Sequence, residues 1–291
     1  MVKKLVNAWT WIDDKWLEGN PPIMGSMTQS TWLGSLVFDG ARRINGKTPD
    51  LDRHCARLIN SADCMNLTPP KSAKEVFDLC IEGCSKFTKN EDLYIKPMIW
   101  AEDGIGVIAP DPDSSRLAVC IFEAPIPDGG MNVCMSDFIR PLSNSAPTDA
   151  KAAALYASTG RAMKAALDKG FDNCILCDHE GYVAEFTVAN LFMVKDGVVH
   201  TPAINGTFLN GITRQRIIKL LQNDGIKVEE RPIDCEELND VDELFSTGNF
   251  AKVMPCNNFQ GNILPLGPIA LRARELYFNF ASNSKIKAIK N

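Results

Sequence analysis

Lys151 lies in an alanine-rich run, residues 146–156, in which Asp149 is the only other charged residue. Such neighbours favour partial burial of the lysine side chain. Burial lowers the pKa of a lysine ammonium and leaves a nucleophilic amine, which is the group that Schiff-base chemistry requires. Most lysines are solvated surface charges, so this residue by itself does not decide a function.

Glu185 follows 34 residues later in the apolar segment 181–186, and Asn190 follows in a second apolar segment, 189–192. An isolated acid in β-like sequence is either an outward-facing charge or a buried functional group, and exposure is the commoner case. A buried Glu185 could be the partner of a protonated ring nitrogen.

Two turns of small residues could bind an anion. Gly211, Ile212 and Thr213 precede a predicted helix, whose first N–H groups and positive dipole end favour an anion. Gly248 and Asn249 form a second turn of this kind. Such a turn is most often only a helix cap. The chain has neither a Walker A sequence nor Gly-x-Gly-x-x-Gly, which leaves a small phosphorylated cofactor as the candidate ligand.

These residues together point to a site for pyridoxal 5'-phosphate. Lys151 would form the Schiff base, Glu185 would keep the pyridine nitrogen protonated, and the two turns would hold the phosphate. A protonated ring can accept the electrons released when the substrate Cα loses its proton. Tyr156, five residues beyond the lysine, could donate a hydrogen bond to the phenolic oxygen of the ring.

Composition narrows the class of protein. The 291 residues suffice for two domains, and a net charge of −5 without a basic stripe argues against nucleic acid as a partner. The first twelve residues lack an apolar core of signal-peptide length, and no apolar stretch approaches the ~20 residues of a membrane span. We therefore expect a cytoplasmic protein.

The ten cysteines could suggest a metal site or disulfides. The pairs Cys80/Cys84 and Cys174/Cys177 lack a second Cys or His pair at zinc-ligand spacing. In a strand, positions 174 and 177 also point to opposite faces. Reduced, buried thiols and no metal are the expectation.

Hydrophobic periodicity predicts an α/β (α+β) protein of two domains. The predicted domains are a smaller N-terminal α/β domain, 1–123, an interdomain linker, 124–134, and a larger C-terminal domain, 135–291, which carries the cofactor lysine. The predicted strands are 9–12, 36–38, 93–100 and 116–122, with a β region over 173–200. The predicted helices are 50–63, 72–84 with a capping box at Ser72, one around 161–167, 213–222 and 272–278.

At this point the chain resembles the class IV aminotransferases, which are fold-type IV pyridoxal phosphate enzymes with a D-amino acid aminotransferase-like fold. It is most similar to the branched-chain amino acid aminotransferases, over about residues 30–280. Its catalytic-lysine, pyridinium-partner and phosphate-turn segments resemble those of the family. Its N-terminal half resembles the stretch His-Tyr-Gly-x-x-Val-Phe-Glu-Gly-x-Arg. The segments are 147–156, 181–192, 209–214, 33–42, 94–97 and 104–107.

The resemblance implies a role for each matching residue. Lys151 is the catalytic residue, and Arg57 matches the phosphate-binding arginine. The implied cofactor-binding residues are Arg57, Lys151, Tyr156, Glu185, Asn190, Gly211, Ile212, Thr213, Gly248 and Asn249. The implied substrate-binding residues are Trp32, Leu33, Phe38, Gly40, Tyr94, Lys96, Phe250 and Ala251.

The resemblance also implies partners. In this family the active site lies between the two domains and includes residues of a second subunit, so the resemblance implies a homodimer. The expected amino donors are leucine, isoleucine and valine, because Trp32, Leu33, Phe38 and Tyr94 supply apolar surface. The expected acceptor is 2-oxoglutarate.

Three departures leave alternatives open. The usual Tyr-Ile-Arg-Pro has Lys96 in place of arginine, and a lysine lacks the bidentate fork. The usual Ser-Gly-Thr-Ala turn has Asn249 and Phe250 at its last two positions, and a tyrosine is replaced by Leu33. A D-amino acid or (R)-amine transaminase is therefore one alternative, and a non-catalytic binding protein is another. An aminodeoxychorismate lyase would typically carry a threonine near Phe38, which is absent. Lys96 itself could be a surface lysine.

Overall fold

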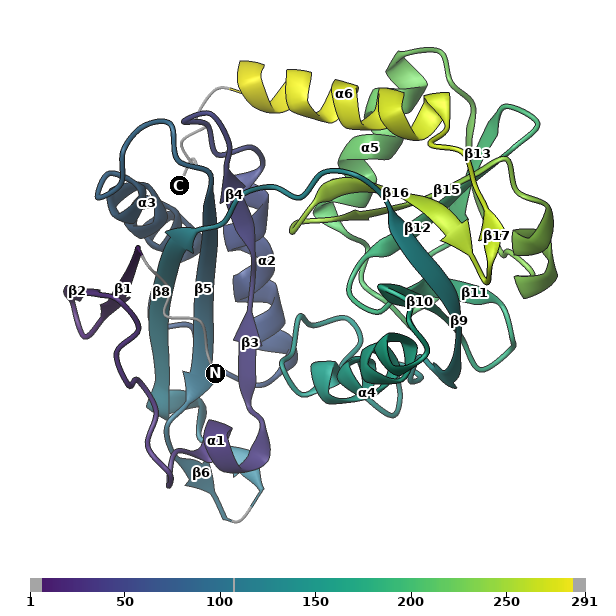
Figure 1. Cartoon of the computed structure of the whole chain (residues 1–291). Helices are drawn as coiled ribbons and strands as arrows, with labels where there is room; N and C mark the ends of the chain where they lie inside the picture. Colours follow the sequence, from purple (N-terminus) through teal and green to yellow (C-terminus); the bar gives the residue numbers. More distant parts are fainter. Residues whose placement is uncertain (1–6, 107, 285–291) are drawn as a thin grey trace. The chain divides into compact units, whose positions relative to one another are not determined.

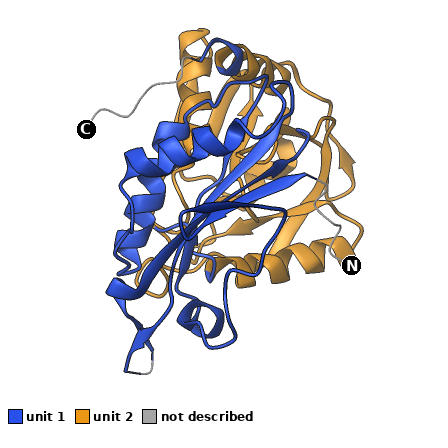
Figure 2. Cartoon of the chain, turned by 90° about the vertical axis from the view of Figure 1, so that its left-hand side faces the viewer, with its two compact units in different colours: residues 1–126, 150–154, 281–291 blue, residues 127–149, 155–280 orange. Residues whose placement is uncertain are grey.

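The computed structural model describes residues 7–106 and 108–284, and the chain divides into two compact units. Unit 1 comprises residues 1–126, 150–154 and 281–291, and unit 2 comprises residues 127–149 and 155–280 (Figure 2). Both units contain helices packed with β-sheet, so the predicted fold class is confirmed.

This division differs from the predicted domains in three places, one of which is that residues 281–291 belong to unit 1 and not to the C-terminal domain. Segment 150–154, which contains Lys151, belongs to unit 1 rather than to the C-terminal part. The reason is that its backbone is hydrogen-bonded to a strand and a helix of unit 1, as described below. In addition, a strand begins at Met131, inside the predicted linker 124–134.

Unit 1 is built on an antiparallel sheet with strand order β2-β1-β8-β5-β3, in which β4 also pairs with β5. Helices α2 and α3 pack against β5 and β8 (Figure 1). The elements are β1 Ala8–Ile12, β2 Lys15–Glu18, α1 Gln29–Leu33, β3 Leu36–Phe38, β4 Ala41–Arg43, α2 Leu51–Cys64, α3 Ala73–Cys84, β5 Leu93–Ala101, β6 Gly104–Ile105, β7 Ala109–Pro110, η1 Pro112–Ser114 and β8 Ser115–Glu123.

Strand alternation gives this sheet two different faces. Ile121 faces α3, since a Cβ on Gly83 of α3 would lie 2.6 Å from its Cδ1. Ile95 is paired in register with Ile121 and is fully buried on the same face. Tyr94 and Lys96, which flank Ile95 along β5, therefore lie on the opposite face, as strand alternation requires. The predicted capping box at Ser72 is also confirmed.

Unit 2 is built on a mixed sheet with strand order β11-β10-β9-β16-β15-β12-β13-β14. An additional β11–β12 pairing closes the strands from β11 through β12 into a ring, and β17 pairs with β16. The elements are β9 Met131–Ile139, α4 Leu155–Asp168, β10 Asn173–Cys177, β11 Val183–Phe186, β12 Asn190–Lys195, β13 Val198–Pro202, α5 Ile212–Asn223, β14 Val228–Arg231, η2 Cys235–Asp240, β15 Glu243–Gly248, β16 Lys252–Phe259, β17 Asn262–Ile263 and α6 Pro268–Asn283.

The core of unit 2 forms between the strands and the helices that cover them. Leu191, Phe186 and Phe259 are fully buried in an apolar cluster, and Ala162 of α4 packs with Cys174 of β10. The predicted β region 173–200 is interrupted near 178–181, at 187–189 and near 195–197. These short connections place β11 and β12 side by side.

The thiol prediction is correct for most cysteines and wrong for one pair. In the described part of the chain, eight cysteines carry free thiols, and all but Cys64 of these are buried. Cys177, at the end of β10, forms a disulfide with Cys235, at the start of η2. No helix among residues 7–106 and 108–284 is both long and apolar enough to cross a membrane.

Candidate active site

The backbone of the lysine segment is fixed against unit 1. The Lys151 carbonyl accepts a hydrogen bond from the Phe38 N–H at 3.1 Å, and the Ala153 N–H donates to the Leu36 carbonyl at 2.8 Å. The Lys151 N–H donates to Ser61 Oγ on α2 at 3.0 Å. Its Nζ lies 4.9 Å from the centroid of the Phe38 ring. The amine is therefore held over an aromatic side chain of β3.

A second lysine contacts the same ring. Lys96 Nζ lies 5.3 Å from the Phe38 centroid, and Tyr94, two residues earlier on β5, stacks on Phe122 of β8 at 5.3 Å. The Arg42 guanidinium lies 5.2 Å from the centre of the Tyr94 ring. This face of unit 1 thus combines aromatic rings with three cationic side chains, two lysines and one arginine, which suits anionic substrates with apolar side chains.

Lys96 lines a cavity of about 270 Å³ on this face. Apolar side chains make up much of its wall, and Lys96 supplies a positive charge. The lining residues are Thr10, Asn20, Pro21, Ile23, Lys96, Met98, Cys120 and Phe122. The site of Lys96 is thus a pocket rather than open surface, which argues against the surface-lysine alternative.

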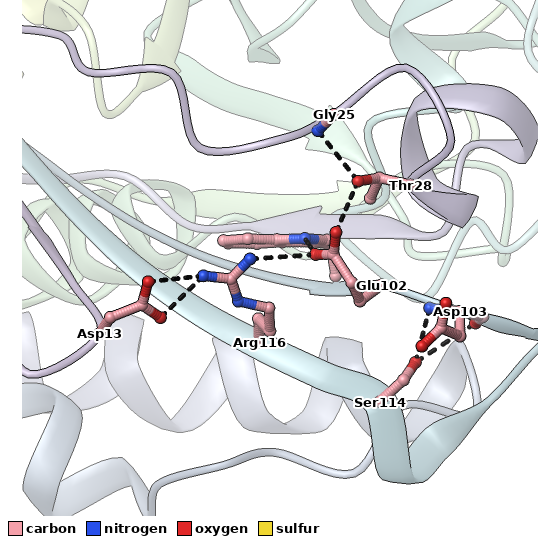
Figure 3. A network of polar contacts seen from close by, with 8 residues as sticks. Asp13, Gly25, Thr28, Glu102, Asp103, Ser114 and Arg116 are labelled. Carbon is pink, nitrogen blue, oxygen red and sulfur yellow. Dashed lines mark hydrogen bonds and ion pairs between the residues drawn. The ribbon is translucent and has the colours of Figure 1, made fainter.

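A polar network fixes residues 25–28, which follow the cavity-lining residues Asn20, Pro21 and Ile23 in the chain (Figure 3). The Gly25 N–H donates to Thr28 Oγ1 at 3.0 Å, and Thr28 Oγ1 donates to Glu102 at 2.7 Å. Arg116 bonds both Glu102, at 3.2 Å, and Asp13, at 2.7 Å. Burial raises the pKa of the Glu102 carboxyl, but hydrogen bonds from Thr28, Trp100 and Arg116 bring it below its ordinary value. Glu102 therefore stays an anion that holds residues 25–28 in place.

Arg57, the predicted phosphate-binding residue, is oriented by a buried acid. Arg57 Nε and Nη2 donate to the two oxygens of Asp39 at 2.7 and 2.9 Å, and His54 Nδ1 lies 2.7 Å from the same carboxylate. Asp39 is fully buried. Burial by itself would raise the pKa of the Asp39 carboxyl, but Arg57 and His54 hold it far below its usual range. Asp39 is thus a fixed anion that sets the direction of the guanidinium.

Sequence reasoning missed Asp39 and His54 as site residues. Both stand inside the motifs that were used, Asp39 directly after Phe38 and His54 three residues before Arg57. A carboxylate beside an otherwise apolar motif was the available signal, because such a group must find a cationic partner when it is buried.

In unit 2, three polar residues lie in a row across neighbouring strands. Glu185 on β11 is paired with Asn190 on β12, which is paired with Thr247 on β15. Directly opposed residues of antiparallel strands share a face. All three are buried, so the buried alternative for Glu185 is correct. Arg140, directly after β9, places its Nε 3.4 Å from a carboxylate oxygen of Glu185 and was not predicted.

Asn190 also holds the first predicted anion turn. Its Nδ2 donates to the Leu209 carbonyl at 2.9 Å, and a Cβ on Gly211 would overlap its Oδ1. Only glycine fits there, and it is the N-cap of α5, which begins at Ile212. Since glycine has no capping side chain, the first N–H groups of α5 suit an anion. Thr213 is buried in this first turn.

The second predicted turn has an orphaned hydroxyl beside it. Thr247 Oγ1 is buried and has no hydrogen-bond partner in the described part of the protein. Next to it, a Cβ on Gly248 would lie 3.2 Å from Ala189 Cβ, so a larger residue would crowd the turn. A buried polar atom of this kind needs a partner. The residues present therefore fit a polar cofactor group.

Comparison with known proteins identifies the family. The model for amino-transferase class IV matches residues 36–259. The chain belongs to the class IV aminotransferases.

This aminotransferase is similar along most of its length to proteins of known name. The probable branched-chain-amino-acid aminotransferase of Rickettsia bellii is 33% identical over 263 residues, which cover 87% of this chain and 88% of that protein. The branched-chain-amino-acid aminotransferase of Pseudomonas aeruginosa is 31% identical, with 94% and 92% covered.

Solved structures agree with the fold. An aminotransferase from Brucella abortus bound to the cofactor PLP is 45% identical, with a TM-score of 0.93 over 95% of this chain and 99% of that one. The branched-chain amino acid aminotransferase from Escherichia coli is 28% identical, with a TM-score of 0.86 over 97% of each chain.

The remaining predicted site residues of this class IV aminotransferase differ in burial and lie on several different elements. Tyr156 is half-buried in the first turn of α4, and the Gly40 N–H donates to Asp39 at 2.7 Å. Trp32 and Leu33 are exposed on α1, and Phe250 is exposed in the β15–β16 turn, next to Ala251. Their predicted role in binding substrate stays a prediction.

Proposed function

We propose that this class IV aminotransferase uses pyridoxal 5'-phosphate to transfer the amino group of a branched-chain L-amino acid to 2-oxoglutarate. The observation that carries this proposal is the position of the Lys151 amine, which extends from a fixed backbone to within 4.9 Å of the Phe38 ring that Lys96 also contacts. The names of the relatives at 31–33% identity support the substrate class.

The bound cofactor supplies a ring that accepts the electron pair released when the substrate Cα loses its proton. Lys151 would hold the cofactor and would move the Cα proton as general base and then general acid. Glu185, which forms an ion pair with Arg140 at 3.4 Å, would keep the ring nitrogen protonated. Arg57 and the first N–H groups of α5 would be the groups that bind the phosphate, through charge-assisted hydrogen bonds.

Substrate selection is assigned to the face of unit 1 that carries Lys96. Phe38, Met98 and Phe122 offer apolar surface for a branched side chain. Lys96 would bind the second carboxylate of 2-oxoglutarate, because an ammonium in a largely apolar cavity gains most from an anionic partner.

Turnover assays test this proposal directly. The purified enzyme is given 2-oxoglutarate with L-leucine, L-isoleucine, L-valine, D-alanine or (R)-1-phenylethylamine, and we expect turnover with the three L-amino acids. Lys151→Ala should abolish it and remove the borohydride-stable cofactor adduct, whereas Lys164→Ala, at an exposed position of α4, should not. Turnover with D-alanine or the amine but not with L-leucine would refute the substrate class.

We also propose that two copies of this chain form a homodimer. Met27, Trp32, Ile105 and Ile108 are apolar and strongly exposed. Gln29 Nε2 donates to the Ile108 carbonyl at 2.9 Å, which ties α1 to the β6–β7 hairpin. Exposed apolar residues gathered in this way are typical of a protein–protein contact.

Sedimentation equilibrium tests the dimer. The wild type should sediment as a dimer, and the double substitution Trp32→Ser, Ile108→Ser should weaken association about 100-fold or more, as loss of large buried apolar residues does. Ile263→Ser, which removes an equally exposed apolar residue from β17, is the matched control. An unchanged dimer in the double variant would place the contact elsewhere.

The cytoplasmic location, and the exclusion of nucleic acid and membranes as partners, are retained as parts of this proposal. Eight of the ten cysteines carry free thiols, which suits a reducing compartment, although Cys177 and Cys235 form a disulfide.

A further inference from the structure

Lys252 is a fully buried lysine at the first position of β16. Its φ is +66°, in the left-handed region that favours glycine. Gly248 and Lys252 are paired, so residues 249–251 form a three-residue hairpin loop, in which such a position is normally glycine. The backbone conformation at this position favours glycine over lysine, so the contacts of the lysine side chain must explain why a lysine is present.

The ammonium group of Lys252 is directed back onto the loop. Nζ donates to Asn249 Oδ1 at 2.6 Å and lies 5.3 Å from the centroid of the buried Tyr277 ring on α6. Arg274, also on α6, donates to the carbonyls of Ala251 and Val253 at 3.3 and 2.6 Å. Arg274 thus holds the backbone on both sides of Lys252, while Lys252 contacts the side chain of Asn249.

The chemistry of the two groups decides how the Asn249 amide is turned. An ammonium only donates hydrogen bonds, so it selects the carbonyl oxygen of the amide. The amide nitrogen, which only donates, is then directed away from Lys252. An asparagine can otherwise present either end to a ligand, whereas a threonine, the usual residue of this motif, has a hydroxyl that rotates to suit.

We propose that Lys252 is a positioning residue, which turns the amide of Asn249 so that its N–H groups bind the phosphate of the cofactor. The inference rests on the proposed function, in which the Gly248–Asn249 turn holds that phosphate. In this chain, Asn249 and Lys252 together would bind the phosphate that a single threonine binds in the usual motif.

Cofactor titrations of the apoenzyme test this pair. Lys252→Met keeps most of the buried volume and removes the donor, so we expect the Kd for pyridoxal 5'-phosphate to rise about tenfold, as for one charge-assisted hydrogen bond. The Kd for pyridoxal, which lacks the phosphate, should change less than about twofold, and the phosphorus NMR signal of the bound cofactor should shift.

The same substitution in an Asn249→Thr background distinguishes the loss of amide orientation from general damage to the fold. Asn249→Thr should bind the cofactor with near wild-type affinity, and adding Lys252→Met there should cost about twofold or less, since a hydroxyl needs no orienting partner. Lys252→Arg, which also only donates, should retain affinity in the wild-type background. It keeps the test possible if Lys252→Met does not fold.

The outcomes distinguish the two levels of the proposal. An equal loss for pyridoxal and pyridoxal 5'-phosphate, or an equal loss in both backgrounds, would overturn the positioning role of Lys252 and leave the phosphate turn intact. If Asn249→Ala binds pyridoxal 5'-phosphate as tightly as the wild type, then the placing of the phosphate at this turn is itself wrong.

Discussion

Replacing Asp39 by asparagine should weaken both the fold and cofactor binding. The substitution keeps the size of the side chain but removes the negative charge that Arg57 and His54 contact at 2.7 Å. Removal of one partner from a buried ion pair costs about 3–5 kcal/mol. The Arg57 side chain is 17% exposed, so water recovers part of this cost, and we expect a loss of about 2–3 kcal/mol in the free energy of unfolding.

Cofactor binding by the same variant follows from the orientation of Arg57. Without two carboxylate oxygens to fix it, the guanidinium loses its set direction, and we expect the Kd for pyridoxal 5'-phosphate to rise about tenfold, or 1.4 kcal/mol. Urea denaturation and a fluorescence titration of the apoenzyme measure the two effects. Asp78→Asn, which changes an exposed acid on α3, is the matched control. Unchanged affinity and stability in Asp39→Asn would refute this account of Arg57.

The dependence on pH gives a third measure. Because the pKa of the Asp39 carboxyl is lower in the folded protein than its ordinary value of 3.8, its contribution to stability is fully present above pH 3.8. That contribution is lost as the pH falls below 3.8 towards the folded pKa. The difference in unfolding free energy between the wild type and Asp39→Asn should therefore shrink below about pH 4, as the Asp39 carboxyl of the wild type becomes protonated.

Three further substitutions test other parts of the site. Gly211→Ala should lower the free energy of unfolding in urea by about 1–3 kcal/mol and weaken cofactor binding, because the added Cβ would overlap Asn190. The control Gly160→Ala, whose Cβ meets open space on α4, should not lower the free energy of unfolding. Lys96→Met should raise the KM for 2-oxoglutarate about tenfold and that for pyruvate less than twofold, and equal changes would show that Lys96 does not bind the second carboxylate. Glu185→Gln should keep the cofactor but lower kcat about 100-fold or more, since a neutral amide does not hold the ring nitrogen protonated, and normal turnover would exclude this role.

Local sequence was sufficient for features that depend on neighbours along the chain. The alternation of Tyr94, Ile95 and Lys96 predicted which side chains share a face, because the repeat of a strand is fixed by its backbone geometry. The Ser72 capping box was predicted for the same reason, since its two partners are three residues apart. The order of the motifs was sufficient for the family, and the fold class followed.

Only the tertiary structure decided which distant residues meet. Asp39 pairs with Arg57, and Glu185 with Arg140, across separations that no local pattern encodes. Cys177 and Cys235 form their disulfide across 58 residues. The physical reason is that a side chain's partner depends on sheet register and helix packing, which only the folded chain determines.

Sheet register and helix packing also explain the residues that the sequence assigned to the wrong domain or did not indicate as site residues. Lys151 belongs to unit 1 because its backbone bonds to β3 and α2, although it follows the predicted linker in the sequence. Thr247 is a site residue because its strand register places it opposite Asn190. Lys252 has a left-handed backbone conformation, and its ammonium donates a hydrogen bond to Asn249. Residue types and spacing thus determined the chemistry of this aminotransferase, whereas cross-strand register and turn conformation determined which residues orient the groups that perform it.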